Sequence, residues 1–442
     1  MRAARGLNVM RVAIATAALF AACTAAPAEF TDDPNNANLT YWYWAESDAP
    51  GANDWMQARI DEYEAKYPGV TIDLVLQSTD TLIGAFMTAA QTGSGPDIAT
   101  QWAGIFTLSQ AWAGAITPIS DLVPEDERSD WINVAENTYD GKLWAMPLYI
   151  IGVPLTYNKD LLAQAGVDNP PATYEELLLA CDALRAKGIT PIGGGNKNGY
   201  FGGWFFSNFA KQNLGSVNEM QQAIIGTEDL ASEKYTGYYA AMEEMRDRGC
   251  FNDDIASLDL DQGSALFGAG KAAMSWGTDG MVANWAKMLG SDVIGVARTP
   301  KWGEGALADV YNTTQSSSAF VTSWTEHPRA AAQFLSWLHE PANVASWYEA
   351  TGVFPANTGF DQALLSTDLA KAQWELTSQP GGVWLQNYVP PAVDGDGSLA
   401  AGQIITSVGS SPDAVQTFVA AAEKWRSQNP AEVEAYTAWA NR

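Results

Sequence analysis

The alternation of strand and helix patterns near the N-terminus constrains the fold of this chain more than any other feature. Strand, helix, strand, helix and strand patterns follow one another at residues 39–44, 53–67, 70–76, 82–92 and from 98 onward. The first strand, LTYWYW, is β-branched and aromatic, and Pro68-Gly69 ends the first helix. Alternation at this pace predicts βαβ units, an α/β fold and a mostly parallel sheet.

Helical patterns recur through the rest of the chain. Residues 173–187 open with Thr173 and Glu176, the spacing of a capping box. Other segments predict helices at 232–248, 261–270, 328–350 and 412–428, and a strand at 294–302. A chain of 442 residues is too long for one ordinary domain and suits two.

The charge of the chain excludes one class of partner. Lysine and arginine total 24 against 51 acidic residues, a formal net charge of -27. Proteins that bind nucleic acids need basic surface to displace counterions from phosphates, so we expect no nucleic-acid partner. Anionic lipid also repels such a chain, and we therefore expect any membrane attachment to be covalent.

The first 22 residues have the layout of an export signal. Three arginines, Arg2, Arg5 and Arg11, precede an uncharged apolar stretch at residues 12–22. This stretch is too short for a spanning helix and fits the apolar part of a signal peptide. We therefore predict an export signal at residues 1–22.

Cys23 ends the apolar stretch directly after Ala22. The string Leu-Phe-Ala-Ala-Cys resembles the lipobox of bacterial lipoproteins, in which the cysteine is lipidated and becomes the new N-terminus. Ordinary cleavage after Ala28, in an A-x-A site, is the alternative. We predict lipidation of Cys23 and a flexible tether at residues 23–38, because that segment is small, polar and proline-containing.

Two further cysteines, Cys181 and Cys250, fall in or at the end of predicted helices. The sequence leaves open whether they form a disulfide or remain two buried thiols. Neither has the spacing of a metal site. The chain contains two histidines, His327 and His339, both in a predicted helical region, so we expect no zinc site and no cofactor.

Six short strings occur in an order and at spacings that resemble the extracellular solute-binding proteins of ABC importers. The resemblance is greatest to the maltose-binding-protein-like, sugar-binding group and covers nearly all of the chain after the signal. The strings are Tyr63-Glu64-Ala65-Lys66-Tyr67-Pro68-Gly69-Val70, Gly95-Pro96-Asp97-Ile98, Gly141-Lys142-Leu143-Trp144-Ala145-Met146-Pro147, Tyr157-Asn158-Lys159-Asp160-Leu161, Phe267-Gly268-Ala269-Gly270-Lys271-Ala272-Ala273-Met274 and Ala330-Ala331-Ala332-Gln333-Phe334-Leu335.

This resemblance implies a two-lobed periplasmic-binding-protein-like fold with a hinge and an interlobe cleft. It places chain crossovers near residues 150, 303 and 353, so that each lobe is built from two pieces. The first lobe would comprise residues 39–150 and 304–352, and the second lobe residues 151–303 and 353–442. It further implies a monomer that carries a carbohydrate to the membrane permease subunits of an ABC importer.

Aromatic and polar residues at strand ends suggest where a sugar would bind. Flat rings cover the apolar faces of sugars, and carboxylates and amides bind their hydroxyls. The chain contains 18 tryptophans. Ligands of open α/β sheets bind at the carboxyl ends of strands. In the first lobe we therefore predict as ligand contacts Trp44, Glu46, Ser78, Gln101 and Trp102.

In the second lobe, tryptophans beside glycines mark two further segments, at 202–205 and 275–280. The family also uses a late loop, which matches residues 394–398, and Tyr149 lies at the first crossover. The further predicted contacts are Tyr149 at the crossover and, in the second lobe, Trp204, Trp276, Asp279 and Asp396. Tryptophans are usually buried in cores and an aspartate can be a helix cap, so each residue also has a purely structural interpretation.

Two other functional classes compete with sugar binding. One is a binding protein for a non-sugar solute such as a polyamine, a peptide or a phosphorylated compound. The other is a secreted glycoside hydrolase, which needs two opposed carboxylates. No spacing singles out such a pair, and the sequence contains no G-x-S-x-G string and no P-loop. We therefore expect no catalytic residues.

Overall fold

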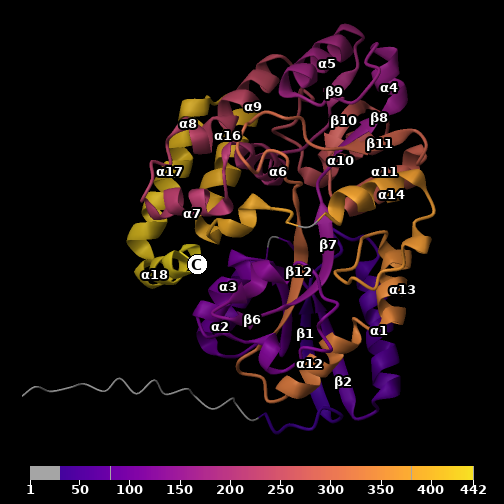
Figure 1. Cartoon of the computed structure of the whole chain (residues 1–442), viewed down its shortest axis with the longest axis vertical. Coiled ribbons are helices and arrows are strands. Elements are labelled where there is room, and N and C mark those ends of the chain that lie inside the picture. Colours follow the sequence, from indigo (N-terminus) through magenta and orange to yellow (C-terminus); the bar gives the residue numbers. More distant parts are fainter. Residues whose placement is uncertain (1–29, 80, 380, 442) are drawn as a thin grey trace, which may run out of the picture.

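The protein is described by a computed structural model that covers residues 30–79, 81–379 and 381–441 (Figure 1). The predicted export signal, Cys23 and Ala28 lie outside the described residues. Of the tether predicted at residues 23–38, the structure describes residues 30–38. Asp32 accepts hydrogen bonds from the backbone N–H groups of Arg329 (3.0 Å) and Ala330 (3.2 Å), and the first strand begins at Ala37. The segment from Asp32 onward is therefore attached to the first lobe.

The first lobe contains a six-stranded sheet. Its order is β2-β1-β3-β12-β4, with β7 also paired to β12. The strands are β1 (Ala37–Tyr43), β2 (Val70–Leu76), β3 (Ile98–Trp102), β4 (Ile116–Thr117), β7 (Met146–Gly152) and β12 (Thr313–Thr322). Strands β2 and β3 run parallel to β1, as predicted, whereas β12 is antiparallel to β3, β4 and β7. The sheet is therefore mixed, because its central strand returns from a distant part of the chain.

Helices cover this sheet and bury its aromatic residues. They are α1 (Ala52–Lys66), α2 (Leu82–Thr92), α3 (Ile105–Trp112), α12 (Pro328–Trp337) and α13 (Pro341–Thr351). Tyr41 of β1, Tyr63 of α1 and Phe334 of α12 are fully buried and meet edge to face. The single helix predicted at 328–350 is two helices, because Pro341 starts the second and disfavours a helical residue before it.

The second lobe contains a four-stranded sheet of order β11-β8-β10-β9. Its strands are β8 (Leu155–Asn158), β9 (Thr190–Ile192), β10 (Ala272–Trp276) and β11 (Ile294–Ala297). A separate two-stranded hairpin, β5 (Thr138–Tyr139) and β6 (Lys142–Leu143), comes between β4 and β7 in the chain. Its helices are α4 (Lys159–Gln164), α5 (Tyr174–Ala186), α6 (Tyr200–Phe209), α7 (Val217–Ile225), α8 (Glu233–Thr236), α9 (Tyr238–Asp247), α10 (Leu260–Gly268), α11 (Asp279–Leu289), α14 (Asp368–Thr377), α15 (Pro391–Val393), α16 (Ala400–Thr406), α17 (Ser411–Gln428) and α18 (Pro430–Ala440).

The edge of the second lobe is fixed by a helix cap and a disulfide. The capping box predicted at the start of α5 is present: the Thr173 hydroxyl accepts from the Glu176 backbone, and the Glu176 carboxylate accepts from the Thr173 backbone (3.2 Å each). Cys181 on the same helix is joined by a disulfide to Cys250, 69 residues later. Of the two alternatives that the sequence leaves open, the structure contains the bridge.

Two long strands connect the lobes. β7 and β12 lie side by side and antiparallel, and they run between the lower and upper halves of the molecule (Figure 1). The chain leaves the six-stranded sheet after Gly152, enters the other sheet at Leu155, and returns to the first sheet at Thr313. The lobe boundaries at residues 150, 303 and 353 stay predictions.

The C-terminal helix α18 contacts both lobes. It packs against α7 of the second lobe and α3 of the first. Trp112 of α3 meets Tyr436 and Trp439 of α18, with ring centroids 6.5 and 6.0 Å apart. The lobes are thus in contact on a side of the molecule away from β7 and β12 (Figure 1).

None of the described helices combines the length and the hydrophobicity that a membrane-spanning helix needs.

Candidate functional site

A cavity of about 550 Å³ lies between the lobes and is lined by residues of both. This volume is in the range of small-molecule sites in proteins. The first lobe contributes Trp44, Ser47, Asp48, Ser78, Thr79, Trp102 and Phe106. The other lining residues include Lys197, Asn198, Tyr200, Trp204, Asp259, Asp261, Met281, Thr314, Trp384, Gln386, Asn387 and Asp394.

The first lobe presents an aromatic wall at the carboxyl ends of its strands. Trp44 directly follows β1, and Trp102 is the last residue of β3. Their rings meet edge to face at 5.7 Å, and Phe106 packs on Trp102 at 5.1 Å. The Trp44 indole donates a hydrogen bond to the Thr79 hydroxyl (3.0 Å), which fixes the orientation of the ring. The predicted contacts Trp44, Ser78 and Trp102 therefore line one cavity.

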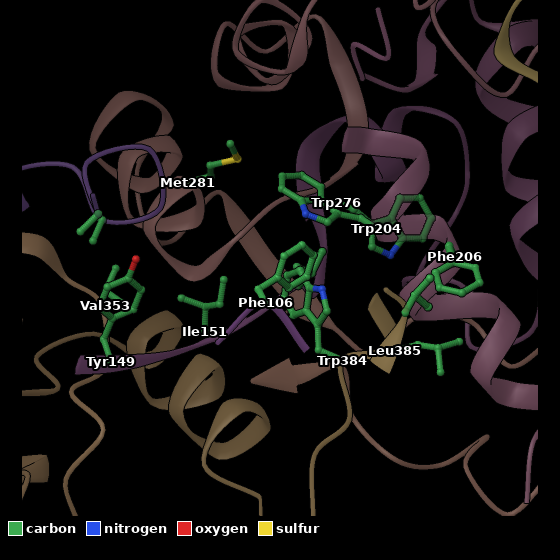
Figure 2. Close-up of a cluster of buried hydrophobic side chains, with 14 of the residues drawn as sticks. Phe106, Tyr149, Ile151, Trp204, Phe206, Trp276, Met281, Val353, Trp384 and Leu385 are labelled. Atoms are coloured by element: carbon green, nitrogen blue, oxygen red, sulfur yellow. The ribbon is translucent and has the colours of Figure 1, made fainter. Parts of the chain in front are cut away.

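The opposite wall contains the predicted contact Trp204, which lies on α6, and also Trp384 and Tyr200. Figure 2 shows Trp204, Trp384 and Phe106 within one cluster of buried side chains. The Trp384 indole donates to the Gln386 side-chain oxygen (3.2 Å). Trp384 was missed in the sequence, although it follows Gly381-Gly382 and so repeats the glycine-beside-tryptophan pattern that marks Trp204.

Asp394 is a buried carboxyl in the cavity wall. It accepts hydrogen bonds from the Gln386 amide (3.3 Å) and from the Ser398 hydroxyl. Burial raises its pKa to about 6, which the two hydrogen bonds partly offset. Asp394 begins a π-helix, Asp394–Leu399, a rare element that often occurs at functional sites. Its position makes it a candidate acceptor for ligand hydroxyls or amines.

Carboxylates outnumber cations around the cavity. Asp48, Asp259, Asp261 and Asp394 line it, and Lys197 is the single lysine or arginine among its described lining residues. A cavity with this balance repels anions and attracts neutral hydrogen-bond donors or cations.

Two acidic residues predicted as contacts have other roles. Glu46 is exposed, and its carboxylate accepts from the backbone N–H groups of Gly51 (2.9 Å) and Asn53 (3.0 Å) at the start of α1. Asp396 is exposed and forms an ion pair with Lys424 (2.7 Å). Neither lines the cavity. The free N–H groups at the start of a helix attract a carboxylate, which explains the position of Glu46. The late loop contributes Asp394 to the cavity lining in place of Asp396.

Gln101 and Trp276 are buried instead of lining the cavity. Gln101 precedes Trp102 on β3, and successive side chains of a strand point to opposite faces. Trp276 is 1% exposed and packs on Phe205 at 4.8 Å, and its indole donates to Thr299 (3.0 Å). Each residue lies near a strand end but outside the cavity lining, and the Gln101 amide has no hydrogen-bond partner within the described residues. Their role as ligand contacts stays a prediction.

Asp279 and Tyr149 lie at the strands that connect the lobes, Tyr149 within β7 and Asp279 in contact with its end, and neither lines the cavity. The fully buried Asp279 carboxylate accepts from the Gly152 backbone (2.7 Å), the Thr377 hydroxyl (3.0 Å) and the Gln373 amide (3.1 Å). Burial raises its pKa to about 6 against these three hydrogen bonds. Asp279 therefore connects α11, the end of β7 and α14.

Tyr149 of β7 stacks on Trp347 at 5.1 Å with an interplanar angle of 17°. Its hydroxyl donates to the Asp48 carboxylate at 3.5 Å, and Asp48 lines the cavity. Tyr149 thus contacts a lining residue, and its direct contact with a ligand stays a prediction. Tyr149 can position Asp48 from behind.

In the described part of the chain, no group of three or more histidine, cysteine, aspartate or glutamate residues could hold a metal ion. The buried His339 interacts with the Pro147 carbonyl (2.7 Å) and the Asn357 amide (3.2 Å). Burial lowers the pKa of His339 to about 4, so its ring is neutral at pH 7.

Comparisons with known proteins agree with this architecture. The sequence is similar to the sn-glycerol-3-phosphate-binding periplasmic protein UgpB of Salmonella paratyphi A, with 24% identity over 362 residues, which are 78% of this chain and 76% of the relative. The fold is similar to that of a chitin oligosaccharide binding protein, with a TM-score of 0.77, 21% identity, and coverage of 91% of this chain and 100% of the other.

It is also similar to RafE in complex with raffinose, with a TM-score of 0.74, 17% identity, and coverage of 90% and 100%. The Thermus thermophilus maltotriose binding protein gives a TM-score of 0.65, 18% identity, and coverage of 87% and 99%. These likenesses establish the two-lobed fold. The model of the family described as bacterial extracellular solute-binding protein matches residues 49–345, more than half of the chain. The chain therefore belongs to the bacterial extracellular solute-binding protein family.

Proposed function

We propose that this protein captures a neutral sugar or oligosaccharide between its lobes, by hinge closure, for delivery to an ABC importer. The observation that carries the proposal is the composition of the cavity. Trp44 and Trp102 on one lobe face a cavity that Trp204 and Trp384 line from the other side, and Asp394 and Asn387 also line it. Aromatic faces with interspersed acceptors suit a ligand with apolar C–H faces and hydroxyl edges.

Relatives of similar fold support a carbohydrate ligand. Those described by name bind chitin oligosaccharide, raffinose or maltotriose. The UgpB relatives are named for sn-glycerol-3-phosphate. A phosphate dianion would meet four aspartates and one lysine in this cavity. Charge repulsion therefore disfavours a phosphorylated ligand here.

The same four aspartates favour one second candidate, a cationic solute such as a polyamine. Asp48, Asp259, Asp261 and Asp394 could pair with several ammonium groups, and the tryptophans could contact them through cation–π interactions. Salt dependence separates the two ligand classes, because the affinity for a polycation falls with ionic strength whereas the affinity for a neutral sugar does not.

The decisive experiment is calorimetry with raffinose, maltotriose, chitin oligosaccharides, spermidine and sn-glycerol-3-phosphate. We expect saturable binding of at least one sugar, with the sugar recovered chemically unchanged by chromatography. Binding of spermidine alone would favour the second candidate. Release of shorter sugars at catalytic rates would overturn the proposal that the protein transports without chemistry.

We further propose that the protein acts as a monomer attached to the outer face of the cell membrane by lipid on Cys23, where it meets permease subunits. The basic start, the apolar stretch and the cysteine after it support this attachment. Mass spectrometry of membrane-extracted protein should find a diacylglyceryl group on Cys23, and Cys23→Ala should release the protein. A mature N-terminus at Glu29 would contradict the anchor.

A further inference from the structure

A second cavity, of about 380 Å³, lies in the second lobe beside the segment that leads into β12. It shares no lining residue with the cavity between the lobes. Its walls include Asn208 of α6, Lys211, and residues 297–301 and 308–312. The solute-binding function proposed above assigns no role to this cavity.

Lys211 is the central residue of this cavity. It is 2% exposed, and its ammonium group donates to the backbone carbonyls of Val310 (2.6 Å) and Val383 (3.4 Å). Within the described residues, no carboxylate lies within 4.0 Å of the Lys211 Nζ. Burial and the nearby positive charge of Arg298 lower its pKa well below the ordinary value. A buried ammonium without a counter-ion is costly, so the site favours an anion.

Two buried amide side chains add unused hydrogen-bond donors. Asn312 is 1% exposed, and neither its Nδ2 nor its Oδ1 has a partner in the protein. Asn208 is 2% exposed; its Oδ1 accepts from the Thr299 hydroxyl (2.8 Å), but its Nδ2 has no partner. Buried polar groups are normally hydrogen-bonded, so these atoms point to a missing partner. Both Nδ2 groups are buried, so the amide side chains must rotate toward the cavity for the oxygens of a ligand to accept from them. The Asn312 Oδ1 is an acceptor, and a P–OH group of a hydrogen phosphate could donate to it.

The rim of the cavity is also basic. Arg298 and Lys301 line it, and Asp309 is the one acidic residue in its described lining. The Asp309 side chain is 88% exposed and lies 3.9 Å from the Lys301 ammonium, so it is placed toward solvent at the rim. The Lys301 ammonium also lies 3.5 Å from the Glu304 carboxylate, so the excess positive charge at this cavity comes from Lys211 and Arg298. This balance is the opposite of that in the interlobe cavity.

We propose that this second cavity binds a small oxyanion of the phosphate class, held by Lys211, Asn208 and Asn312. The anion would neutralise the buried ammonium and satisfy the amide donors through charge-assisted hydrogen bonds. Asn312 directly precedes β12, the strand that connects the lobes. A bound anion thus ties the crossover segment to the second lobe.

The test is a thermal-unfolding titration of the full chain with inorganic phosphate, at ionic strength kept constant with chloride. We expect a saturable rise in Tm for the wild type, because a ligand that binds the folded state stabilises it. Lys211→Met and Asn312→Leu should each weaken phosphate binding by about 10- to 100-fold, the loss expected for one hydrogen bond to a charged group. The exposed Lys271→Met is the matched control and should titrate like the wild type.

No saturable rise in the wild type, or equal rises in the wild type, Lys211→Met and Asn312→Leu, would overturn the proposal. Should Lys211→Met fail to fold, the Asn312→Leu titration decides alone. Sugar affinity, measured on the same variants, should be unchanged, so this proposal can fail while the sugar-binding function stands.

Discussion

Replacing Asp279 by asparagine tests the buried network beside the hinge. In the folded protein, burial raises the pKa of the Asp279 carboxyl from 3.8 to about 6. Folding therefore favours the protonated form. The corresponding stabilisation is fully present below pH 3.8 and is lost as the pH rises through about 6.

The difference between these two pKa values corresponds to about 3 kcal/mol of unfolding free energy over the full range. About 2 kcal/mol of it falls between pH 4.5 and 7.5. Asparagine is neutral at every pH, and its amide can still contact Gly152 and Thr377. We therefore expect the unfolding free energy of Asp279→Asn to fall by about 2 kcal/mol less than that of the wild type over this interval.

The assay is urea unfolding followed by circular dichroism at pH 4.5 and 7.5. Asp394 has a similar pKa, but it is present in both proteins, so its contribution cancels in the comparison. Asp168→Asn, at an exposed position, is the matched control and should follow the wild type. If Asp279→Asn lost as much stability as the wild type between the two pH values, the assignment of a raised pKa to this buried carboxyl would be refuted.

Three further predictions follow from the site and the second lobe. Trp102→Ala should weaken the free energy of sugar binding by about 1–3 kcal/mol in calorimetry, with little loss of stability. Trp276→Ala should instead lower the unfolding free energy by about 3–5 kcal/mol in urea unfolding. Similar behaviour of the two variants would contradict the site. Asp394→Asn should weaken sugar binding about 10-fold at pH 8 and less at pH 5, where the wild-type carboxyl is largely protonated; a pH-independent loss would argue against a charged acceptor. Reducing Cys181–Cys250, which closes a loop of 69 residues, should lower the unfolding free energy by up to about 4 kcal/mol, and finding two free thiols in unreduced protein would exclude the bridge.

Local elements could be predicted from the sequence wherever a local signal ends them. The strand predicted at 70–76 and the helix predicted at 82–92 coincide with β2 and α2. Pro68-Gly69 separates β2 from the preceding helix, and Gly93, with φ of 58°, ends α2. The antiparallel β12 could not be placed in the sheet, because its pairing with β3 joins segments about two hundred residues apart.

The site was predictable to the level of a strand end but not of a side-chain direction. Trp44 and Trp102 line the cavity, whereas the neighbour Gln101 faces a core, because one step along a strand reverses the face. Trp276 ends β10 much as Trp102 ends β3, yet aromatic residues of α6 cover it. Only the packing of a distant helix distinguishes the two tryptophans, and a single sequence does not show that packing.

The central position of β12 in the first sheet has a consequence for folding during synthesis of the protein. A ribosome makes β1, β2 and β3 within the first 102 residues, but β12, which pairs with β3, is complete only at residue 322. At about 5–20 residues per second, the nascent chain waits roughly 10–45 seconds for that strand. Throughout this time the sheet of the first lobe lacks its central strand β12, so this lobe cannot complete its fold. Export machinery that translocates unfolded chains therefore has an interval in which to bind the nascent chain before the first lobe folds.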